Sequence, residues 1–260
     1  MTADVSWFRE LPSTQDHARS LWAAGQVRTL PHAVVADHQL RGRGTHDRAW
    51  HSPLGGLWCT LLTRRTPEPT PPRVAVQIAL CCLDAISATL SLNARDNARL
   101  SIKWPNDLMI DERKFGGLLI EDATGPLGYA RLIGLGVNIA FEAGLLQDQT
   151  EWPATTLLSA FERTVPLAEL NHAILDAIAD FRDDPPNWAD RAAQRLLGRG
   201  KRLVLSVPGP NGQLVPLMGT PAGLDEAGGL VINAQGELHT IRNGRIVAIE
   251  KEFVDKSVSA

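Results

Sequence analysis

Three arginines lie within eight residues of one another, in a segment that also contains glycines and a tryptophan. Arg41, Arg43 and Arg48 are interleaved with two glycines, and Trp50 follows them. Glycine lets a backbone close on a ligand, and a guanidinium offers forked donors to phosphate oxygens. An indole beside them could cover a base or exclude water. The segment therefore predicts a phosphate-binding loop, with a solvated basic loop as the alternative.

A second group of reactive side chains lies in residues 101–121, where apolar strand-like runs flank a Trp-Pro-Asn-Asp turn. Lys103 and Lys114 lie at strand ends, close in sequence to Asn106 and Asp107. Two lysines, an amide and a carboxylate near one opening suit a substrate carboxylate, a nucleotide phosphate and Mg²⁺. The Gly-Gly pair in the following strand predicts a close approach by another group. The alternative is an ordinary hairpin corner.

Other common catalytic motifs are absent from the sequence. It contains no GxxxxGK[ST], HExxH or GxSxG pattern, and Asp47 stands where a dinucleotide-binding loop would need its third glycine. The three cysteines (Cys59, Cys81 and Cys82) include no CxxC pair, so neither a disulfide framework nor a cysteine zinc site is expected. We expect no metal held by protein side chains alone.

Composition excludes several classes of protein. The chain has 260 residues, and 26 basic against 29 acidic side chains give a net charge of −3, which supplies no long-range attraction to nucleic acid. The most apolar stretch, residues 74–92, is interrupted by Asp84, which favours a buried helix over a membrane span. The N-terminus lacks the pattern of a signal peptide. We therefore expect a cytoplasmic protein without a membrane partner.

The elements that must position these residues alternate in type along the first three quarters of the chain. Helices are predicted over residues 13–24, capped by Ser13 or Thr14, and over residues 167–181. Strands are predicted over 32–39, 57–62, 99–104, 107–110, 115–121 and 131–140, with 41–56 as a long Gly-rich loop. This order predicts an α+β body.

Past Gly198 the pattern changes to short strands separated by Gly- and Asn-rich turns. Asn211-Gly212 and Asn243-Gly244 are strong hairpin signals. Length alone allows one large domain or a large and a small one. The sequence therefore predicts a body over residues 1–197 and a small all-β barrel over residues 198–260.

At the two reactive segments the chain resembles the biotin–protein ligases, and the order and spacing of the motifs hold over residues 10–250. Gly42–Trp50 match the family motif GRGxxxRxW, Lys103–Asp107 match KWPND, and Lys114–Glu121 match K-x-x-G-(I/L)-L-x-E. Weaker matches are Ser13-Thr14, Gln39 and Gly134–Asn138.

The resemblance implies a fold and a reaction. The fold would be a mixed sheet flanked by helices, related to class II tRNA synthetases, followed by an SH3-like β-barrel. The substrates would be biotin and ATP, with Mg²⁺ carried by the ATP phosphates. Biotinyl-5′-AMP would form first, and a lysine of the biotin carboxyl carrier protein of acetyl-CoA carboxylase would then accept biotin.

The resemblance also implies roles for individual residues. Lys114, Arg43 and Arg48 would be catalytic, with Lys114 bridging the biotin carboxylate and the α-phosphate, and Asp107 would position the nucleotide, the metal or a neighbouring strand. The residues expected to bind biotin are Ser13, Thr14, Gln15, Gln39, Arg43, Gly44, Thr45, Lys114, Gly117, Gly134 and Gly136. Those expected to bind nucleotide are Arg43, Arg48, Trp50, Lys103, Asn106 and Asn138.

The chain departs from the family pattern at three positions. Gln15 replaces the usual asparagine, Asp47 replaces a common glycine, and Thr45 replaces an arginine that helps retain biotinyl-5′-AMP. The match begins near Ser13, so we expect no winged helix and no operator DNA as a partner, and a homodimer is left open. The alternatives are a lipoate–protein ligase and a non-catalytic regulator that senses biotin.

Overall fold

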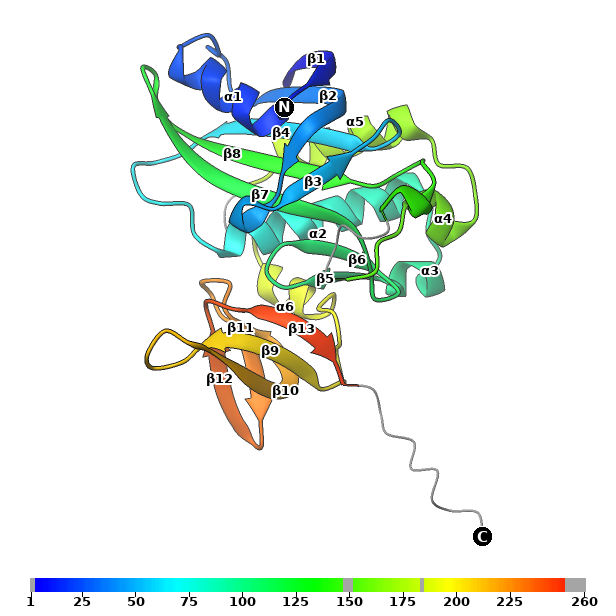
Figure 1. Ribbon diagram of the computed structural model, residues 1–260, viewed down its shortest axis with the longest axis vertical. Coiled ribbons are helices and arrows are strands. Elements are labelled where there is room, and N and C mark those ends of the chain that lie inside the picture. Colours follow the sequence, from blue (N-terminus) through cyan, green and yellow to red (C-terminus); the bar gives the residue numbers. More distant parts are fainter. Residues whose placement is uncertain (1–2, 147–151, 183–184, 251–260) are drawn as a thin grey trace.

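The computed structural model of the chain describes residues 3–146, 152–182 and 185–250. Its body is an eight-stranded sheet in the order β1-β2-β4-β8-β7-β6-β5, with β3 paired to β2 (Figure 1). The strands are β1 (Asp4–Leu11), β2 (His32–Arg43), β3 (Ala49–Ser52), β4 (Leu57–Arg64), β5 (Leu100–Lys103), β6 (Asp107–Ile110), β7 (Arg113–Gly125) and β8 (Gly128–Val137). β1 runs parallel to β2, and the other pairs are antiparallel.

Helices cover both faces of this sheet, as the α+β prediction required. They are α1 (Thr14–Ala23), α2 (Arg73–Thr89), α3 (Ala94–Ala98), α4 (Leu157–Phe161), α5 (Leu167–Ala179) and α6 (Trp188–Ala193). Successive residues of a strand point to opposite faces. Ala33 and Val35 of β2 accordingly belong to the large core under α2 and α5, whereas Val34 packs with Ala18 and Trp22 of α1. The predicted mixed sheet flanked by helices is confirmed.

The helix predictions agree with the structure, and the loop prediction was wrong over residues 41–43 and 49–52, which are strands. Ser13 caps α1, and its Oγ accepts from the backbone N–H of Asp16 at 3.3 Å. Most of the apolar stretch at residues 74–92 forms helix α2, as predicted. In the described part of the chain, no helix is long and apolar enough to cross a membrane. The predicted loop over residues 41–56 is largely a hairpin, because β2 continues to Arg43 and β3 pairs back onto it.

The C-terminal part of the chain forms a second, antiparallel sheet in the order β12-β11-β10-β9-β13. Its strands are β9 (Leu203–Pro208), β10 (Leu214–Leu224), β11 (Leu230–Ala234), β12 (Glu237–Ile241) and β13 (Arg245–Ile249). The hairpin predicted at Asn211-Gly212 joins β9 to β10, but the one predicted at Asn243-Gly244 was wrong. That turn connects opposite edges of the sheet, since β13 pairs with β9.

The short link between β12 and β13 requires the second sheet to curl. Residues 242–244 span at most roughly 14 Å, and yet they join the two edge strands of a five-stranded sheet. No pairing between β12 and β13 is present in the described residues, so the structure does not show the closed barrel that the sequence predicts.

The second sheet lies below the body in Figure 1, next to α6, and packs directly onto it. Its buried residues, among them Leu205 and Ile232, belong to the same hydrophobic cluster as α2 and α5. The indole N–H of Trp104, in the turn between β5 and β6, donates to the carbonyl of Gly228 at 2.9 Å. The turn that carries the reactive residues is therefore anchored to the second sheet.

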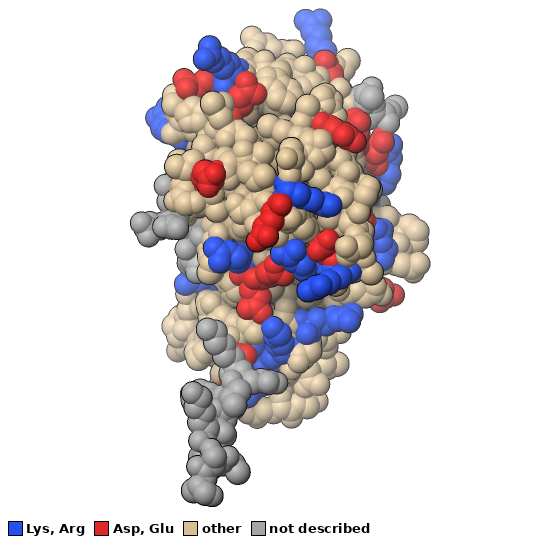
Figure 2. All heavy atoms as spheres, turned by 90° about the vertical axis from the view of Figure 1, so that its right-hand side faces the viewer, with Lys and Arg blue, Asp and Glu red and all other residues tan. Residues whose placement is uncertain are grey.

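Charged side chains of both signs are mixed over the face drawn in Figure 2. Basic and acidic groups lie side by side across its middle and do not form a continuous basic surface. Non-specific attraction to nucleic acid depends on such a surface. The face drawn in Figure 2 therefore carries mixed charge.

Candidate functional site

A cleft lies on the α1 face of the sheet, and its space, counted together with the open solvent at its mouth, is about 950 Å³. Its floor contains Gly117, Gly134 and Gly136, which lie on neighbouring strands: Gly117 is paired with Gly136, and Gly134 with Leu119. Because these glycines have no side chains, nothing projects from the middle of the sheet at this point. The space above it, beside α1, is the cleft. The cleft is concave and has both polar and apolar lining groups, as small-molecule sites do.

Lys103, Asp107 and Lys114 form the cationic end of the cleft. Lys114 Nζ lies 2.5 Å from Asp107 Oδ1, and Lys103 Nζ lies 2.7 Å from Asp107 Oδ2. The register explains the meeting, because Lys103 pairs with Asp107 across β5 and β6, and Lys114 enters on the adjacent strand β7. Two ammonium groups share one carboxylate, so this end carries an excess positive charge.

Burial shifts the protonation of this cluster. It lowers the pKa of Lys114 below its usual value, although Asp107 attracts the charged ammonium and acts in the opposite direction. For Asp107, burial acts to raise the pKa, but attraction to Lys114 and Lys103 outweighs burial and leaves the pKa below its usual range. Asp107 is therefore a carboxylate at neutral pH, and a buried group of net charge +1 favours an anionic ligand.

The opposite end of the cleft is polar, buried and uncharged. Ser13, Thr14, Gln15 and Thr60 are each less than 4% exposed. Gln39 Oε1 accepts from the backbone N–H of Thr14 at 2.8 Å, and Thr60 Oγ lies 3.0 Å from both Thr14 Oγ and Gln15 Oε1. Buried polar groups in fixed orientations suit a small ligand with its own donors and acceptors.

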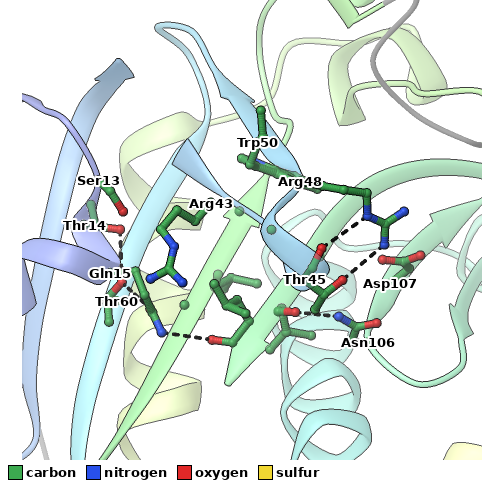
Figure 3. A pocket seen from close by; sticks show the side chains of 18 of the residues that line it. Ser13, Thr14, Gln15, Arg43, Thr45, Arg48, Trp50, Thr60, Asn106 and Asp107 are labelled. Carbon is green, nitrogen blue, oxygen red and sulfur yellow. Dashed lines mark hydrogen bonds between the residues drawn. The ribbon is translucent and has the colours of Figure 1, made fainter. Parts of the chain in front are cut away.

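Figure 3 shows the two ends facing each other across the cleft, with Arg43 between them. The Arg43 guanidinium donates to Asp16 at 2.8 Å and to Glu121 at 3.1 Å. Arg19 also donates to Glu121, at 2.9 Å. Two arginines thus face two carboxylates, and Arg43 adds little net charge to the site, in contrast to Lys103 and Lys114.

The Gly- and Arg-rich segment closes over the cleft as a tight turn. The N–H of Gly44 donates to the carbonyl of Arg48 at 2.7 Å, and Arg48 Nη2 donates to Thr45 Oγ at 3.2 Å. Asp47 has a φ of 56°, in the left-handed region that glycine adopts most easily. This conformation accounts for the glycine common at that position in the family that the sequence resembles.

Trp50 packs against the glycine floor. A Cβ atom at Gly136 would overlap the indole nitrogen of Trp50, and one at Gly117 would lie 3.3 Å from the same ring. Lys114 Nζ is 5.1 Å from the ring centre, a cation–π distance. The indole N–H is buried and has no hydrogen-bond partner. Trp50 therefore forms the roof of the cationic end.

Nearly all residues predicted for the site line this one cleft. Asn138 does not: it is buried, and its side chain donates to the carbonyl of Thr155 at 3.2 Å. Asn106 lines the cleft, but its amide also donates to the carbonyl of Leu118 at 2.6 Å and so fixes the turn. The predicted residues that line the cleft are Ser13, Thr14, Gln15, Gln39, Arg43, Gly44, Thr45, Arg48, Trp50, Lys103, Asn106, Lys114, Gly117, Gly134 and Gly136.

Sequence analysis missed several residues of the site. Thr60 is the only polar side chain in the run LWCTLL, and that isolation in an apolar strand is a signal that could have found it. Trp152 lines the cleft, with Lys103 Nζ 5.6 Å from its ring centre, but nothing in its local sequence marks it. Cys59 also lines the cleft; burial raises its pKa to about 12, so the thiol is not a nucleophile at neutral pH.

The described residues do not offer a protein-held magnesium site. They contain no group of three or more metal-binding side chains, and both oxygens of Asp107 are already paired with lysines. The arrangement as a whole suits a ligand with a polar head at one end and an anion at the other.

Comparisons with known proteins agree with this geometry. Residues 7–138 match the profile of the biotin/lipoate A/B protein ligase family. Over 153 residues the chain is 33% identical to the bifunctional ligase/repressor BirA of Bacillus spizizenii, covering 58% of this chain and 46% of that protein. Over 108 residues it is 36% identical to the biotin–[acetyl-CoA-carboxylase] ligase of Paracoccus denitrificans, covering 41% of this chain and 44% of that protein. The matches thus span less than half the length of these relatives.

The fold is similar to that of a solved ligase over almost its whole length. A structure of the biotin protein ligase from Aquifex aeolicus in complex with biotin and ATP superposes with a TM-score of 0.77. The superposition covers 95% of this chain and 99% of that one, at 23% sequence identity. At this identity the likeness concerns the fold.

Proposed function

Because the chain belongs to the biotin/lipoate A/B protein ligase family, we propose that it activates biotin with ATP and transfers it to a protein lysine. The acceptor would be the biotin carboxyl carrier protein of acetyl-CoA carboxylase, the enzyme named for the Paracoccus relative. One observation carries the proposal: a single cleft has a polar, uncharged end and a largely buried, cationic end.

The first step needs the cationic end. An oxygen of the biotin carboxylate attacks the α-phosphorus of ATP, the bond to pyrophosphate breaks, and biotinyl-5′-AMP forms. Both reactants are anions, so cations must offset their repulsion. Lys114 lies beside the glycine floor and next to the Trp50 ring, where it would contact the carboxylate and the α-phosphate together. Lys103 and Arg48 line the same end and would contact the phosphates.

The second step consumes the adenylate. The amine of the acceptor lysine attacks the biotinyl carbonyl carbon, the bond to the AMP oxygen breaks, and the amine loses a proton. AMP is then the leaving group, and its phosphate would again lie against the cationic end. Mg²⁺ would enter with ATP, since the described residues provide no site of their own for it.

The polar end favours biotin over lipoate as the acid that is activated. The ureido ring of biotin carries N–H donors and a carbonyl acceptor, whereas the dithiolane ring of lipoate carries neither. A dithiolane would gain no hydrogen bond from Thr14, Gln15 and Thr60, which would keep only their hydrogen bonds within the protein, whereas a ureido ring can bond to them. We test this by ATP–pyrophosphate exchange with each acid. Exchange that depends on biotin supports the proposal, and exchange that depends only on lipoate contradicts it.

A regulator that senses biotin without catalysis would give another result in the same assay. It would bind biotin but show no exchange of pyrophosphate into ATP. The retained Lys114, buried beside Asp107, supports the catalytic alternative. A gel shift with upstream DNA separates the two further, because we expect no sequence-specific binding from this chain.

The second sheet completes the architecture that we propose. A body related to class II tRNA synthetases over residues 1–197 would be followed by an SH3-like barrel over residues 198–260. The curl imposed by residues 242–244 supports the barrel. The contact between Trp104 and Gly228 would keep the turn that carries Asp107 in place.

We expect Gly136→Ala to weaken ATP binding while biotin binding changes less. The added methyl would overlap the Trp50 indole and push it off the cationic end. Overpacking of this kind costs enough to raise KM for ATP ~10-fold. Gly144→Ala is the matched control, because a methyl there meets no atom within 4 Å. An unchanged KM for ATP in Gly136→Ala would show that Trp50 does not form the roof of the nucleotide site.

Thr45→Arg is expected to slow the release of biotinyl-5′-AMP. Thr45 lines the cleft where the family has an arginine, and its hydroxyl now accepts from Arg48. A hydrogen bond to a charged group is worth roughly 1.5–3 kcal/mol, which corresponds to ~10-fold slower release. The measurements are adenylate dissociation and biotinylation of albumin as a bystander. Equal rates in the two proteins would show that the side chain at this position does not retain the adenylate.

A further inference from the structure

Glu121 of β7 connects three elements beside the polar end of the cleft. Its carboxylate accepts from Gln15 Nε2 at 2.8 Å, from Arg19 at 2.9 Å and from Arg43 at 3.1 Å. Burial acts to raise the pKa of Glu121, but hydrogen bonds from Gln15 and Arg19 and the attraction of both arginines leave it below its usual value. Glu121 is therefore ionised at neutral pH and can only accept hydrogen bonds.

This carboxylate determines which way the amide of Gln15 points. Because Glu121 has no proton to give, only the NH₂ end of Gln15 can face it, and the carbonyl of Leu119 lies on the same side, 3.5 Å away. The oxygen of Gln15 then points the other way, where Thr60 Oγ donates to it at 3.0 Å. There it lies beside Gly134, where a Cβ would be only 2.6 Å away, and Gly134 lines the cleft.

We propose that Glu121 is a positioning residue that holds the Gln15 carbonyl toward the cleft, so that the site selects head groups with an N–H donor. This inference rests on the proposed function and gives a reason for its choice of acid. A ureido ring supplies such a donor, and a dithiolane ring does not. The sequence pattern marks Glu121 as part of a motif but assigns it no contact, because its partners lie 78 to 106 residues away.

Glu121→Gln removes the restriction without changing the size of the side chain. An amide at position 121 can donate or accept, so Gln15 is free to turn its NH₂ end toward the ligand. We expect the Kd for biotin, measured by calorimetry, to rise by up to ~10-fold, as for the loss of a hydrogen bond between two neutral groups. KM for ATP should change less than ~3-fold, because the cationic end is untouched.

A double exchange separates positioning from general damage. In Gln15→Glu combined with Glu121→Gln, a carboxylate at position 15 accepts at both of its ends, and the amide at position 121 can donate to it. The variant should bind biotin more tightly than Glu121→Gln alone, because an acceptor again faces the cleft. Asp122→Asn on the same strand is the matched control; its partners are Thr70 and Arg65, outside the cleft, and it should bind biotin within ~2-fold of wild type.

Two results would overturn this inference while leaving the proposed function standing. One is a folded Glu121→Gln variant, with the melting temperature of the wild type, that binds biotin as tightly as the wild type. The other is a double exchange that binds no better than Glu121→Gln alone. If the wild-type protein binds no biotin, the proposed function itself fails and this inference fails with it.

Discussion

Lys114→Ala should slow biotin-dependent ATP–pyrophosphate exchange at least ~100-fold, a loss of about 2.7 kcal/mol of transition-state stabilisation, as when one preorganised charge contact is removed. The Lys114 side chain is only 16% exposed, its ammonium lies 2.5 Å from Asp107, and the centre of the Trp50 ring is 5.1 Å away. In this position its charge is little screened by water. Initial rates of exchange at saturating biotin and ATP measure the effect.

Lys201→Ala is the matched control for this prediction. Lys201 also pairs with a carboxylate, Glu112 at 2.7 Å, but both side chains are about half exposed and lie outside the cleft. Its exchange rate should stay within ~2-fold of wild type. If Lys114→Ala also stays within twofold, Lys114 is a structural lysine and the mechanism loses its central residue.

Asp107→Ala is expected to reduce both activity and the free energy of unfolding. The change leaves Lys103 and Lys114 buried together without their shared carboxylate. Removing one partner of a buried ion pair costs ~3 kcal/mol or more, because the remaining charge is uncompensated. Denaturant unfolding measures the loss. Glu112→Ala, which breaks an exposed ion pair, should cost less than ~1 kcal/mol. Equal losses in the two variants would contradict the buried cluster.

The stabilising effect of Asp107 should depend on pH. The pKa of Asp107 is lower in the folded protein than in the unfolded chain, so the unfolded chain binds protons more readily as the pH falls. Its stabilising contribution is complete above the ordinary pKa of 3.8 and is lost as the pH falls through the folded-state value. Asp107→Asn should therefore lose less stability to acid than the wild type does.

The sequence predicts which elements and residues form this cleft better than it predicts which side chains contact each other. Periodicity and capping identify α1 and α2, and the motif spacing brings Lys103 and Lys114 to one opening. That both lysines meet on Asp107 depends on the register of three strands, which spacing does not encode.

Two further features depend on tertiary contacts alone. Arg43 pairs with Glu121, which is 78 positions away. The sequence does not show this pairing, and it therefore predicts that the charge of Arg43 is available to bind phosphate. The turn at Asn243-Gly244 has hairpin chemistry, but β13 pairs with β9 instead of β12, because the curled sheet brings its edges together. Local signals describe a turn, and the packing of the whole sheet selects the strand that follows it.

The most direct test of the account is transfer of biotin to a carrier. The protein is incubated with purified biotin carboxyl carrier domain, biotin and ATP with Mg²⁺, and the intact mass of the carrier is measured. We predict that one biotinyl group is added to one lysine of the carrier, and that none is added when ATP is omitted or lipoate replaces biotin. A carrier that stays unmodified in the complete reaction, with no biotin-dependent exchange of pyrophosphate, would contradict the account.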